Sequence, residues 1–234
     1  MTPVSDVGYT RGVTANSVKR YLCIAISLPL AGLLAQTQQP GGDPSISPNK
    51  QWEYRVSKES AVLVKAGSEE PVVDLAEEIG GLAIESGKVV WAPDSRRFAF
   101  NTRKGGKYYG CELYELKGTT WEKLPQLETS AEAVERLIER TLAKQRKRLG
   151  AEKGAGDYVM TQWRVRRWLD NDTFEAYASE TRRVMLRESD DEPEYFGCAV
   201  LLSAKCDNRG AWKVTTRRVL SDAESRKINE ADDQ

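Results

Sequence analysis

Residues 158–186, YVMTQWRVRRWLDNDTFEAYASETRRVML, contain the pattern that decides the fold. Two runs rich in β-branched and aromatic residues, Tyr158–Leu169 and Phe174–Leu186, lie on either side of the turn-forming segment Asp170-Asn171-Asp172. Residues of these types fit a pleated sheet, and a short Asp- and Asn-containing break between two such runs is typical of a hairpin. This stretch therefore predicts a pair of long antiparallel strands.

The pattern continues toward the C-terminus. The runs Tyr195–Cys206 and Ala211–Leu220 are separated by Asp-Asn-Arg-Gly, another turn signal. Residues 157–221 therefore predict a four-stranded antiparallel meander. The polar residues 222–234 predict a tail or a frayed helix after the last strand.

A single helix is expected before this meander, over residues 130–149. Thr129 and Glu132 have capping-box spacing, which marks a helix start. Four apolar residues follow at helical spacing and predict a stripe that packs on a sheet: Val134, Leu137, Ile138 and Leu142. A helix followed by four strands would also suit a cystatin-like half.

Short β-type runs also fill the N-terminal half, over residues 51–124. They alternate with Gly- and Pro-bearing turns, which favours a second antiparallel meander. The runs are Trp52–Val56, Ala61–Lys65, Val72–Leu75, Val89–Trp91, Phe98–Thr102, Cys111–Leu116 and Trp121–Leu124.

Within this half, residues 89–100 read VVWAPDSRRFAF. Trp91 can fill space between sheets, Pro93 sets a turn, and Asp94 can bond its own backbone two residues on. The segment resembles one repeat of a TolB-type β-propeller, over residues 89–116 and in a single copy. The resemblance implies a blade-like meander, and arrays of such blades serve as protein-docking or substrate-gating surfaces. A closed propeller needs at least four four-stranded blades, whereas this chain has strands for two to three, interrupted by a helix.

Together these patterns predict a mainly β protein of the α+β class. Two antiparallel β-meanders, the first blade-like, are joined by one amphipathic helix. We expect them to form one compact unit.

The N-terminal residues predict export. Lys19 and Arg20 precede a 14-residue apolar run, residues 22–35, which is shorter than the ~20 residues that span a bilayer. Residues 1–35 thus predict a secretory signal peptide cleaved between Ala35 and Gln36, which leaves no stable transmembrane span. The low charge of the preceding segment favours a translation start at Val18. Residues 36–50, rich in Pro, Gly, Ser and Gln, predict a flexible linker.

Composition excludes several classes of function. The chain has no histidine, which removes His-dependent catalytic triads and His-ligated metals. Without Arg11, Lys19, Arg20 and Asp6 of the leader, the totals of 35 basic and 35 acidic residues become 32 and 34, a net charge of −2. This balance argues against non-specific binding to nucleic acid or to an anionic membrane.

Three cysteines lie beyond the leader: Cys111, Cys198 and Cys206. If Cys198 and Cys206 share one strand, they are about 26 Å apart, too far for a disulfide. In an oxidising compartment Cys111 can pair with either of them, and the alternative is three small buried residues.

No catalytic, cofactor-binding or metal-binding set of residues stands out. Asp170-Asn171-Asp172 offers carboxylates but no EF-hand spacing, and solvated turns of this kind are common. Arginine pairs recur at Val165–Trp168, Thr181–Val184 and Thr216–Val219. With Lys144–Arg148 they could bind a polyanion, but interleaved glutamates favour solvated strand faces.

The sequence therefore favours a non-enzymatic binding or assembly module of the cell envelope, periplasmic or extracellular. Its expected partner is another envelope protein. Two alternatives stay open: an envelope hydrolase that uses carboxylates, and a polyanion-binding module. An exposed aromatic patch near Tyr108 and Tyr109 would favour binding.

Overall fold

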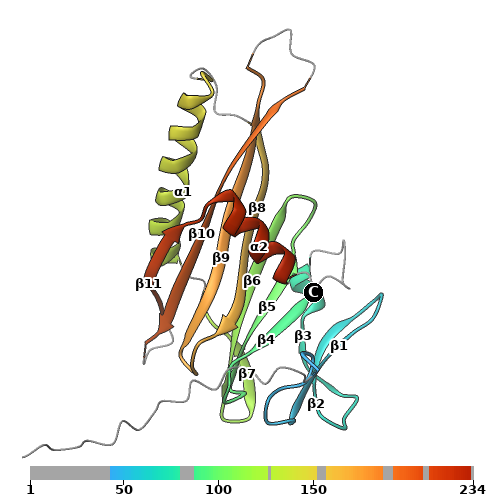
Figure 1. The fold of residues 1–234 in the computed structure, drawn as a ribbon. Helices are drawn as coiled ribbons and strands as arrows, with labels where there is room; N and C mark the ends of the chain where they lie inside the picture. The colour runs from blue at the N-terminus through green and yellow to red at the C-terminus, as the bar shows by residue number, and fades with distance from the viewer. Residues whose placement is uncertain are drawn as a thin grey trace, which may run out of the picture. The chain divides into compact units, whose positions relative to one another are not determined.

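The computed structural model describes residues 43–79, 87–125, 128–151, 157–186, 192–207 and 211–232. All of them belong to the compact unit formed by residues 35–234. The expected leader over 1–35, the Ala35–Gln36 cleavage site and the first part of the linker lie outside the described residues. The chain is mainly β, as the sequence predicted, with two sheets and two α-helices (Figure 1).

The C-terminal meander forms as expected. Its strands are β8 (Asp157–Trp168), β9 (Thr173–Val184), β10 (Glu194–Cys206) and β11 (Trp212–Val219). Each pairs antiparallel with the next.

The N-terminal strands divide between two sheets, a partition that the spacing of the runs did not indicate. A separate three-stranded sheet contains β1 (Trp52–Val56), β2 (Ala61–Lys65) and β3 (Pro71–Asp74), and a short 3-10 helix, η1 (Ala76–Ile79), follows it. The four-stranded antiparallel meander begins later, with β4 (Lys88–Trp91), β5 (Arg97–Arg103), β6 (Tyr108–Lys117) and β7 (Thr120–Lys123). The strands expected as one meander over 51–124 thus form two groups, β1–β3 in the small sheet and β4–β7 in the large one.

The two meanders are one eight-stranded sheet. Strands β6 and β8 join them by a short parallel pairing, in which Tyr108 and Tyr109 lie opposite Thr161 and Gln162. The sheet curls so that β5 also meets β8. There the Asn101 amide pairs with Val165 like a backbone group, donating to its carbonyl at 2.7 Å and accepting from its N–H at 2.9 Å.

Two hydrophobic cores share strand β5. Phe98 and Phe100 face a core built with the three-stranded sheet, where Trp52 and Trp91 also lie. Ala99, the residue between them, belongs to the larger core beneath α1. Because side chains alternate along a strand, β5 is buried on both faces. This arrangement supports the expectation of one compact unit.

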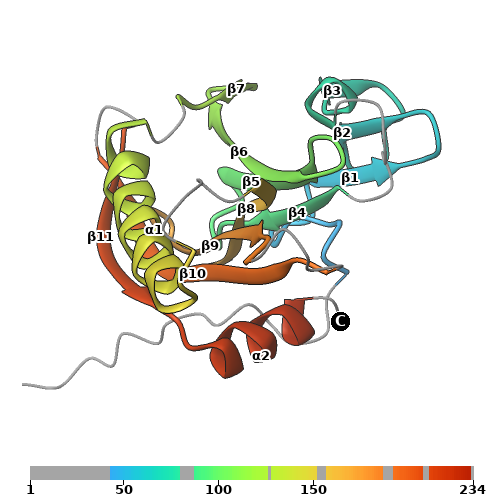
Figure 2. The same cartoon turned by 90° about the horizontal axis from the view of Figure 1, so that it is seen from above.

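The two helices cover opposite faces of the sheet, as Figure 2 shows. Helix α1 (Glu128–Arg148) packs on β9, β10 and β11, with the predicted stripe facing them: Val134, Ile138 and Leu142 are buried and Leu137 is partly buried. The helix runs from Glu128 to Arg148, within two residues of the expected bounds 130–149.

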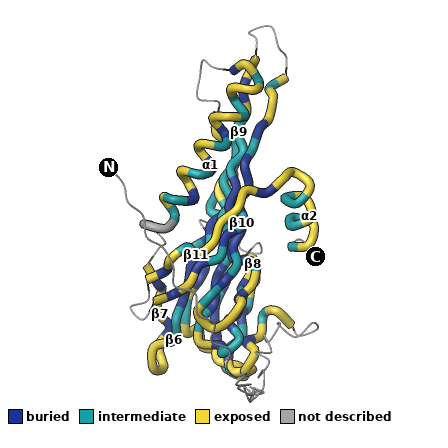
Figure 3. Tube along the Cα trace, turned by 60° about the vertical axis from the view of Figure 1, so that its left-hand side comes forward, coloured by how far each residue is buried: buried dark blue, intermediate teal, exposed yellow. Residues whose placement is uncertain are grey.

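The polar tail expected over 222–234 contains helix α2 (Asp222–Asp232). Ser221 and Glu224 form its capping box. The Ser221 N–H donates to the Glu224 carboxylate at 2.9 Å, and the Glu224 N–H donates to Ser221 Oγ at 3.3 Å. The helix has no fully buried residue among those described (Figure 3). It is therefore attached to the sheet mainly by polar contacts.

The turn after β4 has the geometry expected from its sequence. Trp91 is 2% exposed between the two sheets. The Asp94 carboxylate accepts the Arg96 N–H at 2.9 Å, the bond two residues on that the motif predicted. Ser95 takes a positive φ of 59°. Pro93 lies between these residues, and the Asp94 N–H donates to Asn171 in the β8–β9 turn. The TolB-type resemblance itself stays a prediction.

The described part of the predicted linker, residues 43–50, is packed on the fold. Ile46 forms an isolated bridge with Glu53, Ser47 is buried, and the Asn49 N–H donates to Ser95 Oγ at 2.9 Å. These residues contact the two sheets. The ordered part of the chain therefore begins before Gln51, the residue at which the flexible linker was expected to end.

The three cysteines are free thiols: Cys111, Cys198 and Cys206. Neither of the disulfides left open by the sequence is formed. Cys198 and Cys206 share strand β10, as the sequence suggested. Among the described helices, none has the length and apolar character needed to cross a bilayer.

Candidate functional site

Strand β10 extends beyond its neighbour β11. The two strands pair from Val200–Val219 onward, and a bond from the Leu220 N–H to the Ala199 carbonyl continues the ladder by one step. The chain then turns away into α2, because Ser221 caps that helix. Residues 194–198 of β10 are therefore paired with β9 on one side only.

The hydrogen-bonding groups of this segment follow from the ladder. In an antiparallel sheet, alternate residues direct both backbone groups toward the same neighbour. Ala199 points toward β11, so the N–H and C=O groups of Gly197 and Tyr195 point the same way. In the part of the chain that the structure describes, β11 supplies no partner for them. They form a free strand edge.

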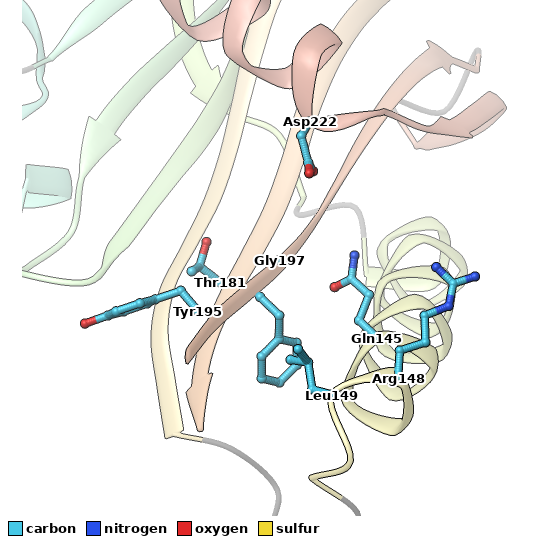
Figure 4. Close-up of a pocket in the computed structure, with 8 residues that line it drawn as sticks. Gln145, Arg148, Leu149, Thr181, Tyr195, Gly197 and Asp222 are labelled. Atoms are coloured by element: carbon cyan, nitrogen blue, oxygen red, sulfur yellow. The ribbon is translucent and has the colours of Figure 1, made fainter. Parts of the chain in front are cut away.

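A groove of about 450 Å³ lies along this edge. It runs between β10 and the last turns of α1, with the start of α2 above it, as Figure 4 shows. Its volume is in the range of sites that bind ligands. The residues that line it are Gln145, Arg148, Leu149, Thr181, Tyr195, Phe196, Gly197 and Asp222.

The groove combines apolar and polar groups. Phe196 is 8% exposed and supplies an apolar wall, whereas Tyr195 is 60% exposed. The side-chain oxygen of Gln145 is buried without a hydrogen-bond partner among the described residues. A buried acceptor of this kind is costly to leave unpaired, which favours the entry of a donor.

Positive charge dominates the helix side of the groove. Arg148 lines it, and Lys144 lies one turn earlier on the same face of α1. Both side chains are exposed, and neither forms an ion pair with another described residue. The opposite rim carries one carboxylate, that of Asp222. The residues that line the groove thus carry one positive charge, on Arg148, and one negative charge, on Asp222, and Lys144 adds a second positive charge one turn from Arg148.

A cluster of charged residues that joins the buried Glu112 to the partly buried Glu78 lies elsewhere in the described ranges, between η1 and β5–β7. Lys104 binds Glu112 and Glu78, and Lys123 lies 2.6 Å from Glu78 and 3.1 Å from Glu112. Burial raises the pKa of the Glu78 carboxyl, but the bonds and charges of Lys123 and Lys104 outweigh it and hold the pKa below its ordinary value. A general acid in a hydrolase needs the opposite shift. This cluster has the chemistry of a structural ion-pair network.

Five of the six recurrent arginines of the second meander are also ion-paired, whereas Arg217 forms no ion pair with another described residue. Arg164 and Arg166 bind Asp232, and Arg166 and Arg167 bind Glu175. The remaining pairs are Arg182 with Glu180 and Glu139, Arg183 with Asp157, and Arg218 with Glu224. The strand faces that carry them are therefore balanced in charge, as the interleaved glutamates suggested.

The Asp170–Asp172 turn takes part in internal contacts. Asp172 accepts Arg97 at 2.5 Å, and the Asn171 carbonyl accepts the same guanidinium at 2.9 Å. In the part of the chain that is described, no three metal-ligating side chains come together. Tyr108 is 41% exposed at the start of β6, and Arg103 lies over the Tyr109 ring. Neither tyrosine lines the groove.

The sequence motif residues Trp91, Pro93 and Asp94 lie in the β4–β5 turn and serve packing. The groove residues were missed. Their signal was the sequence Ser221-Asp-Ala-Glu224, a capping box that ends β11 before it can cover the start of β10. Comparisons of the chain with protein-family models, curated proteins and solved structures give no match.

Proposed function

We propose that this protein is a non-enzymatic binding module that acts outside the cytoplasm and docks another protein of the cell envelope. The observation that carries the proposal is the groove along the free edge of β10. It brings together unpaired backbone groups, the exposed Tyr195 and the cationic Arg148, and a free strand edge of this kind is a surface to which another chain can bind.

The proposed compartment rests on the sequence. The basic residues Lys19 and Arg20 precede the apolar run 22–35, the organisation of a secretory leader. N-terminal sequencing of the protein from an envelope fraction should find Gln36 as the first residue. Recovery of the chain from the cytosol with residues 22–35 attached would contradict export.

Binding is tested by a pull-down from an envelope extract with the immobilised protein and two tyrosine variants. Tyr195→Ser changes the groove, and Tyr108→Ser makes the same change at an exposed tyrosine outside it. We expect a partner that the native protein and Tyr108→Ser retain and Tyr195→Ser loses. Equal retention by all three, or no retention by the native protein, argues against the groove as the binding site.

A further inference from the structure

We infer that the groove binds its partner as an extended, acidic peptide segment, which adds to the sheet beside β10 in the place that β11 leaves open. This inference rests on the proposed binding function and names the chemistry of the partner. It follows from three features of the groove: the direction of the free backbone groups, the space beside them and the charge of the rim.

The backbone groups specify an extended chain. Tyr195 and Gly197 each present one N–H and one C=O toward the groove, spaced as in a strand. A neighbouring strand at about 4.8 Å matches this alternation of donors and acceptors. Side chains of a helix or a small ligand cannot satisfy all four groups in this geometry.

The space beside the edge also suits a strand. The groove of about 450 Å³ is bounded by Leu149 and Phe196 on the apolar side and by Thr181 on the other. There is little room for a side chain at position 197, since a Cβ there would lie 3.2 Å from the Glu180 carbonyl oxygen and 3.4 Å from Thr181 Oγ1. The unpaired oxygen of Gln145 offers one more acceptor for an entering N–H after rotation of its side chain.

Charge selects among extended peptides. Arg148 lines the helix side of the groove and Lys144 lies one turn earlier on α1, both without an ion-pair partner among the described residues, whereas Asp222 is the one carboxylate that lines the groove. Carboxylates on the added segment would complete these ion pairs, and cationic peptides would be repelled. The preferred occupant is therefore a strand with acidic residues toward α1.

Because the Gly197 N–H points toward the free edge, two substitutions at this residue test strand addition. Gly197→Pro removes this N–H and blocks the free edge, but it leaves the β9 ladder intact because the N–H points away from β9. Gly197→Ala introduces the same Cβ and keeps the N–H, so it is the matched control for the close contacts with Glu180 and Thr181.

The probe is a fluorescent eight-residue peptide of alternating threonine and valine with glutamates at both ends, and its binding to the full chain is followed by anisotropy. We expect binding to the native protein and to Gly197→Ala, and a loss of about tenfold or more with Gly197→Pro. Replacing the glutamates by lysines should weaken binding, most strongly at low salt.

A second measurement uses the native protein alone, so that it holds even if Gly197→Pro fails to fold. Two peptides are compared, each N-methylated at alternate residues. The peptide whose methylated nitrogens would face β10 should not bind, and the peptide whose methylated nitrogens would face away from β10 should bind. Equal binding of both methylated peptides, or no binding of the acidic peptide, overturns strand addition. A dimer that Gly197→Pro abolishes would assign the edge to a second copy and also overturn it.

These results separate the two proposals. If the envelope pull-down depends on Tyr195 but the partner is retained by Gly197→Pro, the groove binds proteins without strand addition. If the native protein retains no partner but binds the acidic peptide through its backbone, the peptide site stands and the envelope function fails.

Discussion

Individual charged residues are buried here only where an opposite charge accompanies them. The Glu112 side chain is 2% exposed, yet Lys104 and Lys123 both reach its carboxylate. The same lysines bind Glu78, so two positive and two negative groups neutralise one another. Removing one member would leave an uncompensated charge, which costs far more than an exposed ion pair contributes.

This cluster predicts a pH dependence of stability. The pKa of Glu78 is lower in the folded protein than its ordinary value of 4.5. The stability from this group is therefore fully present above about pH 4.5 and is lost as the pH falls through the lower folded pKa. In urea titrations, Glu78→Gln should reduce the free energy of unfolding at neutral pH and flatten its decline below pH 4.5.

The matched control for this change is Glu59→Gln, on the exposed β1–β2 turn, where no ion pair with another described residue is lost. It should follow the native pH profile. A Glu78→Gln profile parallel to the native one down to pH 3 would show that this carboxyl contributes no pH-dependent stability.

Among the elements, helix α2 is the one attached most weakly. Beneath it, the small apolar cluster of Tyr177, Ala199 and Leu220 is joined by Ile228. Its other attachments are polar: Tyr177 shares a hydrogen bond with Ser225 at 2.8 Å, and Arg166 binds the Asp232 carboxylate at 3.0 Å. Elements with few buried contacts open first.

Two adjacent arginines test this docking. Arg166 binds Asp232 on α2 and Glu175 on β9, whereas Arg167 is 59% exposed and binds Glu175 alone. Arg166→Met should raise hydrogen exchange of the α2 amides by about tenfold, because a charge-assisted attachment is lost. Arg167→Met should change it by less than about twofold. Equal effects of the two variants would contradict the assigned attachment.

Most elements could be predicted from local patterns. The runs Trp52–Val56 and Ala61–Lys65 coincide with β1 and β2, and the stripe from Val134 to Leu142 identified the buried face of α1. Helix α2 was expected only as a tail or a frayed helix, because its polar sequence has no apolar stripe, although Ser221 and Glu224 marked its start. Local signals thus define elements well and their attachments poorly.

At the scale of the whole molecule, the way the strands assemble was beyond the sequence. The parallel contact of Tyr108 with Thr161 joins residues 53 positions apart, and no periodicity encodes it. The groove has the same origin: it exists because β10 and β11 differ in where their pairing ends. The site depends on where the pairing of β10 and β11 ends, although each of the two strands was predicted correctly by itself.

The shared strand β5 predicts a single unfolding transition. The Asn101 amide on β5 pairs with the backbone of Val165 on β8, and Val165 is 1% exposed. Asn101→Ala leaves those backbone groups unsatisfied and should lower the free energy of unfolding by about 1–3 kcal/mol. Because each hydrophobic core has three of the six tryptophans in it or packed against it, tryptophan fluorescence reports on the unfolding of both cores.

Fluorescence and far-UV circular dichroism should therefore give coincident transitions, in the native protein and in Asn101→Ala alike. Two separated transitions, with only one of them shifted by the substitution, would show that the cores unfold independently.

The reactivity of the free thiols reports local opening of this protein. Burial raises the pKa of Cys111 to about 12 and also raises the pKa of Cys198, so neither reacts with maleimide until its surroundings open. Cys198 follows Gly197 directly and faces α1. Its labelling rate, read by peptide mass spectrometry, measures how often the helix lifts from the strand edge, and a tightly held occupant should slow it while leaving Cys111 unchanged.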